Sequence, residues 1–255
     1  AFATLGIQNE ALIAGLTDWT LQEGFQSTFN PQAVASTAWA FATLGIQNKA
    51  LMAGLAERTL QQGFLSTFNP QIAANTAWAF ATLGIQNEAS IAGLTERTLQ
   101  EGFVSTFDPQ NVANAAWACA KLEIHNGALM AGLAGRTLQR GFLSTFNPQN
   151  VDDTAWAFAT LGIQNAALIA GLAERTMQGG FLSTFNPQAV ANTAWVFAKL
   201  EIQKELLMAG LADRTLQQVF LSAFNPHNVA NTAWAFATLG IQNEALMAAL
   251  AERTL

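Results

Sequence analysis

The chain has 255 residues, of which 51% are hydrophobic, and its 17 Asp and Glu residues outnumber 11 Lys and Arg residues to give a net charge of −6. This negative charge argues against the class of nucleic-acid binders that depend on a strongly basic surface. The single cysteine, Cys119, excludes an internal disulfide. No apolar run reaches the roughly 18 residues of a transmembrane helix, and no targeting segment is recognisable.

A 39-residue period runs through the sequence. It relates Trp39, Trp78, Trp117, Trp156, Trp195 and Trp234, and it relates all six prolines. Such a period is typical of a repeat array, which works through an extended surface. The sequence therefore predicts one array over 1–255, with repeats at 29–67, 68–106, 107–145, 146–184 and 185–223 and partial repeats at 1–28 and 224–255. Because both ends lie inside a repeat, we expect a piece of a longer array.

The repeat 68–106 begins with a first helix predicted over 70–83. Asn69 is a favourable N-cap residue, and Pro70 suits the first helical position. Gly84 follows as the residue that ends the helix in the left-handed conformation. Trp78 lies within a wide apolar face made of Ala and Phe. We therefore expect the tryptophan in the core between neighbouring repeats.

A second helix is predicted over 88–105, with Asn87 as its N-cap residue. Gly93 and Gly102 would lie inside this helix, where each glycine lowers helix stability by about 1 kcal/mol relative to Ala. We therefore expect a neighbouring backbone to approach closely at these glycines. The buried stripe of this helix is expected to contain Leu94, Leu99 and Phe103. Two antiparallel helices per repeat predict an all-α fold, an α-solenoid with a right-handed superhelix.

Polar residues are predicted to form a stripe along the first helices, on the side away from the tryptophans. In stacked repeats they would give a ribbon of amide and hydroxyl groups able to pair with base edges. Equally, these groups could be solvated or could hydrogen-bond between helices, and the sequence leaves both alternatives open. The candidate residues are Ser36, Thr37, Asn75, Thr76, Asn111, Asn114, Asn150, Asp153, Asn192, Thr193, Asn228 and Asn231, with Lys121 and Lys199 as the cations of the stripe.

The remaining chemistry-bearing residues suggest structural roles. Glu96 and Arg97, like the equivalent pairs of other second helices, are adjacent and so do not face each other, which predicts a solvated outer face. Cys119 stands where other repeats have Phe and reads as a small core residue. His125 and His227 lack the partners of a metal or catalytic site. We expect no catalysis, no metal, no cofactor and no small-molecule substrate.

The run 68–84, FNPQIAANTAWAFATLG, and its counterpart 224–240 resemble the octotricopeptide repeat. That family comprises helical-hairpin arrays that bind RNA in organelles and act in the maturation, stability or translation of chloroplast and mitochondrial transcripts. The resemblance implies that polar positions of the first helices, such as Asn111 with Asn114 and Asn228 with Asn231, read bases. With one base per repeat, it implies a low-complexity target of about six nucleotides.

Two functions follow from these expectations. The leading one is non-catalytic binding of single-stranded RNA in a chloroplast or mitochondrion. The alternative is a protein–protein scaffold or structural subunit of a large organellar complex, which the negative charge and the scarcity of cations favour, since phosphate contacts dominate RNA affinity. A basic ribbon would favour RNA, and a neutral apolar groove would favour a protein partner.

Overall fold

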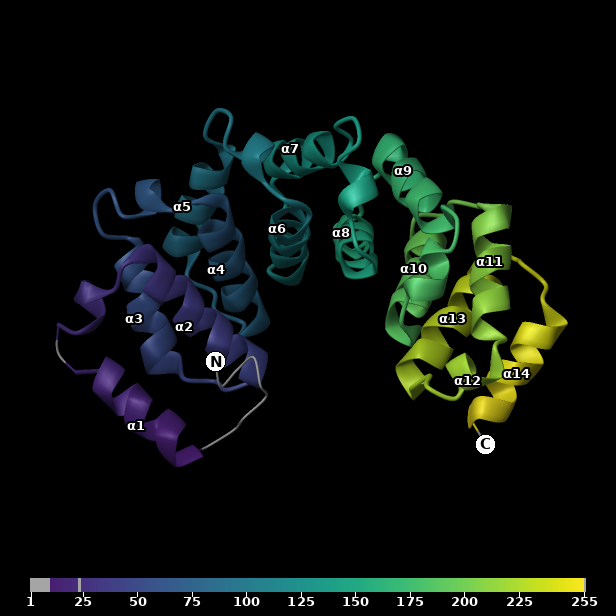
Figure 1. Cartoon of the computed structure of the whole chain (residues 1–255), viewed down its shortest axis with the longest axis horizontal. Helices are drawn as coiled ribbons and strands as arrows, with labels where there is room; N and C mark the ends of the chain where they lie inside the picture. The colour runs from purple at the N-terminus through teal and green to yellow at the C-terminus, as the bar shows by residue number, and fades with distance from the viewer. Residues whose placement is uncertain (1–9, 23, 255) are drawn as a thin grey trace. The chain divides into compact units, whose positions relative to one another are not determined.

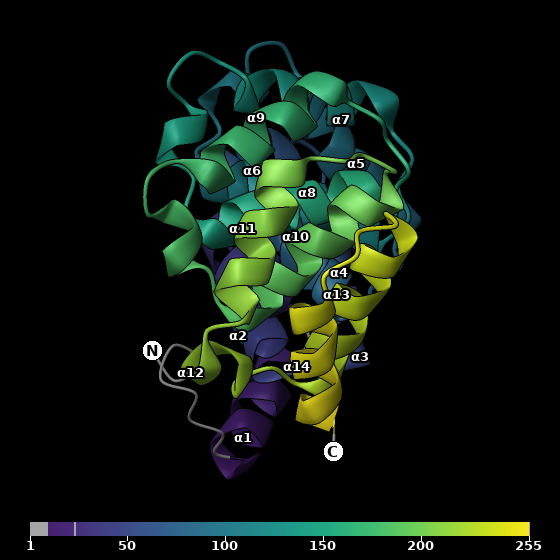
Figure 2. The same cartoon turned by 90° about the vertical axis from the view of Figure 1, so that its right-hand side faces the viewer.

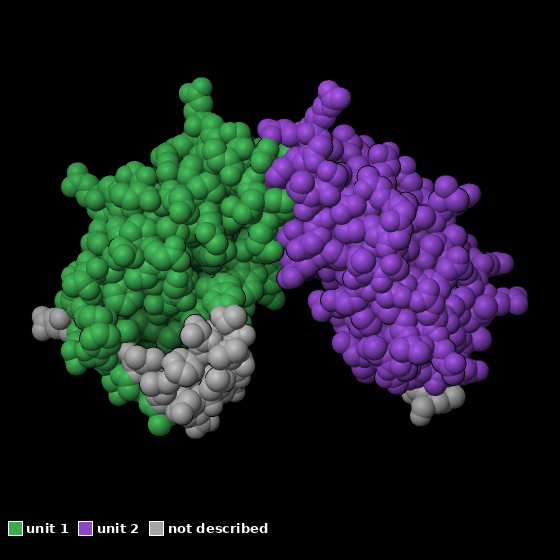
Figure 3. Space-filling model, viewed as in Figure 1, with its two compact units in different colours: residues 1–136 green, residues 137–255 purple. Residues whose placement is uncertain are grey.

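The computed structural model describes residues 10–22 and 24–254, and this part of the chain is all-α. It contains 14 α-helices, short 3-10 helices and no β-strand, which confirms the predicted fold class. The chain divides into two compact units, Ala1–Arg136 and Thr137–Leu255 (Figure 3). Among the described residues, no helix has the length and apolar character needed to cross a bilayer.

In the first unit, consecutive first helices pack side by side. These are α2, α4 and α6; α3 packs on α2, and α5 packs on α4 (Figure 1). The bounds of the helices that begin in this unit are α1 (Glu10–Thr20), α2 (Pro31–Leu44), α3 (Lys49–Thr59), α4 (Pro70–Thr82), α5 (Glu88–Leu99), α6 (Pro109–Lys121) and α7 (Gly127–Thr137).

The second unit repeats this arrangement. The first helices α8, α10 and α13 pack side by side, while α9 packs on α8, α11 on α10 and α14 on α13 (Figure 2). The bounds are α8 (Pro148–Thr160), α9 (Ala166–Met177), α10 (Pro187–Lys199), α11 (Glu205–Thr215), α12 (Gln218–Leu221), α13 (Pro226–Thr238) and α14 (Glu244–Thr254). Paired helices in both units agree with the predicted α-solenoid, and the superhelical hand stays a prediction.

The first helices begin and end close to the predicted residues. Asn69 accepts a hydrogen bond from the backbone N–H three residues further on, at 2.9 Å, and α4 ends at Thr82. Gly84 then has φ of 66°. Glu123 and Glu201 replace this glycine in two repeats and keep the left-handed conformation with φ of 56°. A side chain there costs roughly 1–2 kcal/mol, so the turn is preserved against local strain.

The second helix is shorter than the predicted 88–105. α5 ends at Leu99, and a 3-10 helix, Val104–Thr106, follows. Gly102 lies in the intervening turn with φ of 75°, not inside the helix, and this left-handed conformation cannot continue a helix. Leu99 is 40% exposed, so the predicted stripe is wrong there, while Phe103 lies beyond the end of α5 and packs, partly buried, against the core.

Gly93 does lie inside α5, but its close neighbour is a side chain and not the expected backbone. A Cβ atom on Gly93 would lie 2.5 Å from Cδ1 of Leu65, in the 3-10 helix Leu65–Thr67 of the preceding repeat. In the second unit, a Cβ on Gly171 would lie 3.1 Å from Cδ2 of Leu143. Glycine therefore lets the 3-10 turn of one repeat pack onto the second helix of the next.

The arginines of the second helices bind backbone carbonyls, which corrects the predicted solvated face. Arg97 donates to the carbonyl oxygen of Phe68 from Nη2 at 2.7 Å and from Nε at 3.1 Å. Its guanidinium also lies 4.1 Å from the ring centroid of Phe103. Equivalent bonds join Arg58 to Phe29, Arg136 to Phe107 and Arg175 to Phe146, while Arg214 and Arg253 donate to Ser183 and Ser222. The arginine thus closes each helical hairpin.

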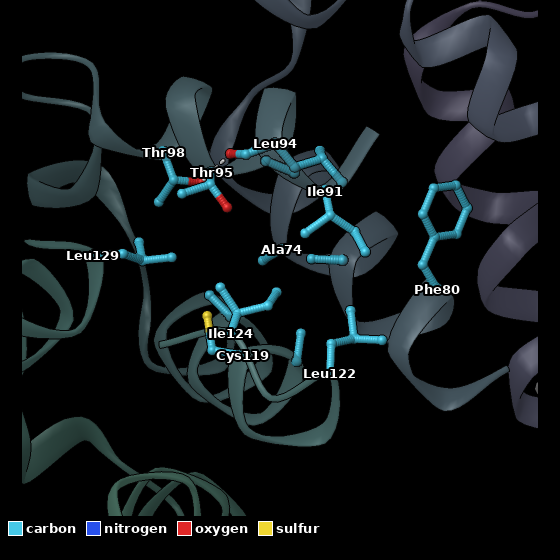
Figure 4. Close-up of a pocket in the computed structure, with 14 residues that line it drawn as sticks. Ala74, Phe80, Ile91, Leu94, Thr95, Thr98, Cys119, Leu122, Ile124 and Leu129 are labelled. Carbon is cyan, nitrogen blue, oxygen red and sulfur yellow. Dashed lines mark hydrogen bonds between the residues drawn. The ribbon is translucent and has the colours of Figure 1, made fainter. Parts of the chain in front are cut away.

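Cys119 is buried, as predicted for a small core residue. Burial raises the pKa of its thiol to about 12. The residue stands where Phe80 and Phe158 stand in other repeats, and a pocket of about 30 Å³ remains beside it, lined by apolar side chains such as Ile91 and Leu129 (Figure 4). The pocket is a small packing defect left by the missing ring.

We expect Lys204→Asn to raise the free energy of unfolding by about 1 kcal/mol. Lys204 is the N-cap residue of α11 and makes no capping bond, whereas Asn165 caps α9 with a 3.0 Å hydrogen bond from the backbone N–H of Leu168. Urea denaturation measures the change. The control Asn165→Lys should lower the free energy by a similar amount; no change in either variant would contradict the capping argument.

Arg97→Lys should lower the free energy of unfolding by about 1–2 kcal/mol, because an ammonium cannot keep both bonds to Phe68 and the contact with Phe103. The matched control is Arg140→Lys, at an exposed position, with an expected change within about 0.5 kcal/mol. Thermal or urea unfolding of both variants is the measurement. Equal losses in the two would show that hairpin closure has no special role.

Candidate nucleic-acid interface

Within each unit, the tryptophans of the first helices lie partly exposed on one face, and not in the core as predicted. The ring centroids of Trp78 and Trp117 are 6.1 Å apart, and those of Trp195 and Trp234 are 6.4 Å apart, so the rings do contact between repeats. Phe80, two residues after Trp78, is fully buried in the core. Alanine-rich first helices approach closely, which leaves no room for an indole between them.

Polar side chains share this face with the tryptophans, which corrects the prediction that they lie on the opposite side. Gln71, Asn75, Trp78 and Thr82 follow the spacing i, i+4, i+7 and i+11, which places them on one side of α4. All four are at least partly exposed. These four positions, with their equivalents in the other first helices, constitute what we call the Trp face of each unit.

Eight of the candidate RNA-reading residues belong to the Trp face: Ser36, Asn75, Asn114, Asp153, Asn192, Asn231, Lys121 and Lys199. Asn114 is almost fully buried and donates from Nδ2 to Oδ1 of Asn75 at 3.0 Å. Gln110 in turn donates from Nε2 to Oδ1 of Asn114 at 2.7 Å. For Asn75 and Asn114, hydrogen bonding between helices is therefore what the structure shows.

The other six candidates lie away from the Trp face: Thr37, Thr76, Thr193, Asn111, Asn150 and Asn228. Thr76, two residues before Trp78, is fully buried on the opposite side of α4. Asn150 accepts from the backbone N–H of Asn147 at 3.2 Å and closes a capping box at the start of α8. Five of these six residues are buried and Thr37 is partly buried, so they lie away from the exposed surface, and base reading by them stays a prediction.

Sequence reasoning missed the glutamines of the Trp face. Gln71, Gln110, Gln149 and Gln188 are exposed at the start of consecutive first helices. Each precedes the tryptophan of its helix by seven residues, which is about two helical turns. That fixed spacing was the available signal, and His227 takes the same position in α13.

A groove of about 450 Å³ lies between the starts of α8 and α10 in the second unit. Asp152 in its wall is 6% exposed; Oδ2 accepts from Nδ2 of Asn192 at 3.0 Å, while Oδ1 has no partner. Burial, together with the charge of Asp153, raises the pKa of Asp152 well above its usual range despite the Asn192 bond. Burial also raises the pKa of Asp153 to about 6, against a hydrogen bond with Gln149 that lowers it.

Positive charge is sparse on the Trp face of the described residues. Six arginines of the second helices donate to backbone carbonyls, as described above. Lys121 at the end of α6 and Lys199 at the end of α10 are exposed, and each lies one turn after a tryptophan. The Trp face is therefore rich in aromatic and amide side chains, and its lysines lie only at the ends of α6 and α10.

Asp152→Ala should raise the free energy of unfolding at pH 7 by about 1–3 kcal/mol, because a buried carboxyl with an unpaired oxygen is removed. A pKa raised in the folded state means that the native carboxyl destabilises the fold above the unfolded pKa of about 3.9. The advantage of the variant should therefore shrink as pH falls toward 4. Urea unfolding at several pH values is the measurement; a pH-independent difference would contradict the assignment.

Comparison with known proteins gives the family. A search of curated proteins finds no match. A family model described as RNA-editing substrate-binding complex 6 protein matches residues 1–142 and 140–255. Since these two matches together span all 255 residues, the chain belongs to the RNA-editing substrate-binding complex 6 protein family, a helical family related to RNA editing.

Proposed function

We propose that this protein binds single-stranded RNA along the Trp face, without catalysis. The supporting observation is the recurrence of a partly exposed tryptophan beside glutamine and asparagine on consecutive first helices. Stacking of a base on an aromatic side chain contributes about 1–3 kcal/mol, and amides both donate to and accept from base edges. Membership of an RNA-editing-related family supports the same ligand class.

Within this proposal, Lys121 and Lys199 contact phosphates next to Trp117 and Trp195. So few cations give modest affinity, because phosphate contacts dominate RNA binding. We further propose an organellar role, in a mitochondrion or chloroplast, in transcript maturation, stability or translation. The octotricopeptide resemblance and the reading of one base per repeat stay predictions.

The second candidate is a protein–protein scaffold within a large organellar complex. It is favoured by the net charge of −6 and by the engagement of the arginines in backbone hydrogen bonds. Exposed tryptophans such as Trp234, which is 44% exposed, are also common anchors in protein interfaces. Binding of RNA by the isolated chain separates the two candidates.

Replacement of both Trp78 and Trp117 by Leu should weaken binding of a randomised single-stranded RNA pool at least about tenfold, through lost stacking. The matched control is Trp19→Leu, since Trp19 is 52% exposed on α1, outside the Trp face. Fluorescence anisotropy gives the affinities. Changing Lys121 and Lys199 to Gln should reduce the slope of log affinity against log salt by about 1.4, at roughly 0.7 per phosphate.

Equal weakening by the Trp78/Trp117 pair and by the Trp19 control would show that RNA binding does not use the Trp face. An absence of RNA binding even at low salt would favour the scaffold. Isolation of the protein neighbours of the chain would then identify the partner.

A further inference from the structure

Asp152 interrupts an otherwise constant position of the first helices. The equivalent residues are Ala35, Ala74, Ala113, Ala191 and Ala230. A fully apolar position has thus become a nearly buried carboxyl with one unpaired oxygen in a single repeat. Uncompensated departures from a local rule point to functional sites more often than to structural needs.

The groove that contains Asp152 opens beside the Trp face. Asp153 and Gln149 line it from α8, and both belong to the Trp face, at three and seven residues before Trp156. Gln188 lines it from α10 and is exposed. The groove therefore offers carboxylate acceptors on one wall and amide groups that both donate and accept on either side.

The carboxyl and amide groups of the groove favour a ligand that presents several N–H donors along one edge. The Watson–Crick edge of guanine carries two adjacent donors, N1–H and the N2 amino group, next to the O6 acceptor. Uracil has a single N–H between two acceptors, while adenine and cytosine each place one amino group beside an acceptor. A carboxylate accepts both guanine donors, and a glutamine amide can donate to O6. The charge of Asp153 also repels phosphate, so the base, not the backbone, would enter.

We propose that the groove between α8 and α10 is a guanine-reading subsite for single-stranded RNA bound along the Trp face, with Asp153 and Asp152 accepting from the base. This inference rests on the proposed function. In the bound state, Oδ1 of Asp152, which has no partner in the free chain, gains a hydrogen-bond donor from the base. The repeat 146–184 then differs from its neighbours in base preference.

The test compares short oligouridylates that carry one central guanosine, inosine or uridine, with affinities from fluorescence anisotropy. Inosine keeps the purine rings, N1–H and O6 but lacks the N2 amino group, so it controls for stacking. The wild-type chain should bind the guanosine oligonucleotide about tenfold more tightly than the inosine one, as expected for one bidentate contact. Free GMP, with its charged phosphate, should compete poorly.

Two variants address the residues. Asp153→Asn introduces the residue of Asn75 and Asn114, and Asp152→Ala introduces the residue of the other repeats. Each should remove the preference for guanosine over inosine, measured as the ratio of the two affinities of the same variant. Asp213→Asn is the matched control, since Asp213 is exposed on α11 and its loss changes the net charge equally. Circular dichroism verifies that each variant is folded.

The outcomes separate this inference from the function on which it rests. Tight binding of all three oligonucleotides with equal affinity by the wild-type chain would overturn the subsite and leave RNA binding intact. No binding of any of them would overturn both. A guanosine preference that survives Asp153→Asn and Asp152→Ala would place guanine reading elsewhere. Competition by GMP at the affinity of the RNA would assign the groove to a free nucleotide.

Discussion

Hairpin closure by arginine is the interaction on which the rest of the fold depends. The carbonyl of Phe68 precedes the capped start of α4 and lies outside the helical hydrogen bonding, and Arg97 satisfies it from the end of α5. The aromatic ring of Phe103 stacks on this guanidinium and packs edge-on against Phe107, at a centroid distance of 5.7 Å. Phe107 in turn presents its carbonyl to Arg136. Closure of one hairpin thereby positions the next.

This use of arginine shapes the functional surface. A guanidinium committed to a backbone carbonyl and an aromatic ring is not available to phosphates, so the array keeps few cations for RNA. The alanines of the first helices permit close packing of neighbouring helices, and the indoles consequently lie at the edge of that layer. The Trp face is therefore a product of core packing, and its aromatic character compensates in part for the scarcity of positive charge, since stacking needs no counter-charge.

Residues close in sequence were sufficient to predict where the helices begin. Which side of each helix is buried depends on residues far apart in the sequence. The Asn69–Pro70 pair determines the start of α4 through contacts within four residues, and prediction was accurate there. Gly102 was placed inside the helix because its residue type alone does not reveal its left-handed conformation. Thr76 and Asn75 are adjacent and equally polar, but Thr76 is fully buried and Asn75 is partly exposed. An alanine-rich helix has no apolar face distinct enough to reveal that rotation, so eight of the fourteen candidate residues were assigned to the wrong side.

Near-identical repeats pose a problem of register for any extended ligand. If every first helix presented the same tryptophan, glutamine and asparagine, a single-stranded chain could shift by one repeat at no change in free energy. The departures from the repeat remove this degeneracy: Lys121 and Lys199 mark two helix ends, and Asp152 with Asp153 marks one groove. A buried carboxyl lowers stability, and marginal stability tolerates only a few such positions. Under the proposed binding of RNA, the uniform positions would supply affinity, and the one distinctive groove would fix the register of the ligand on the repeats.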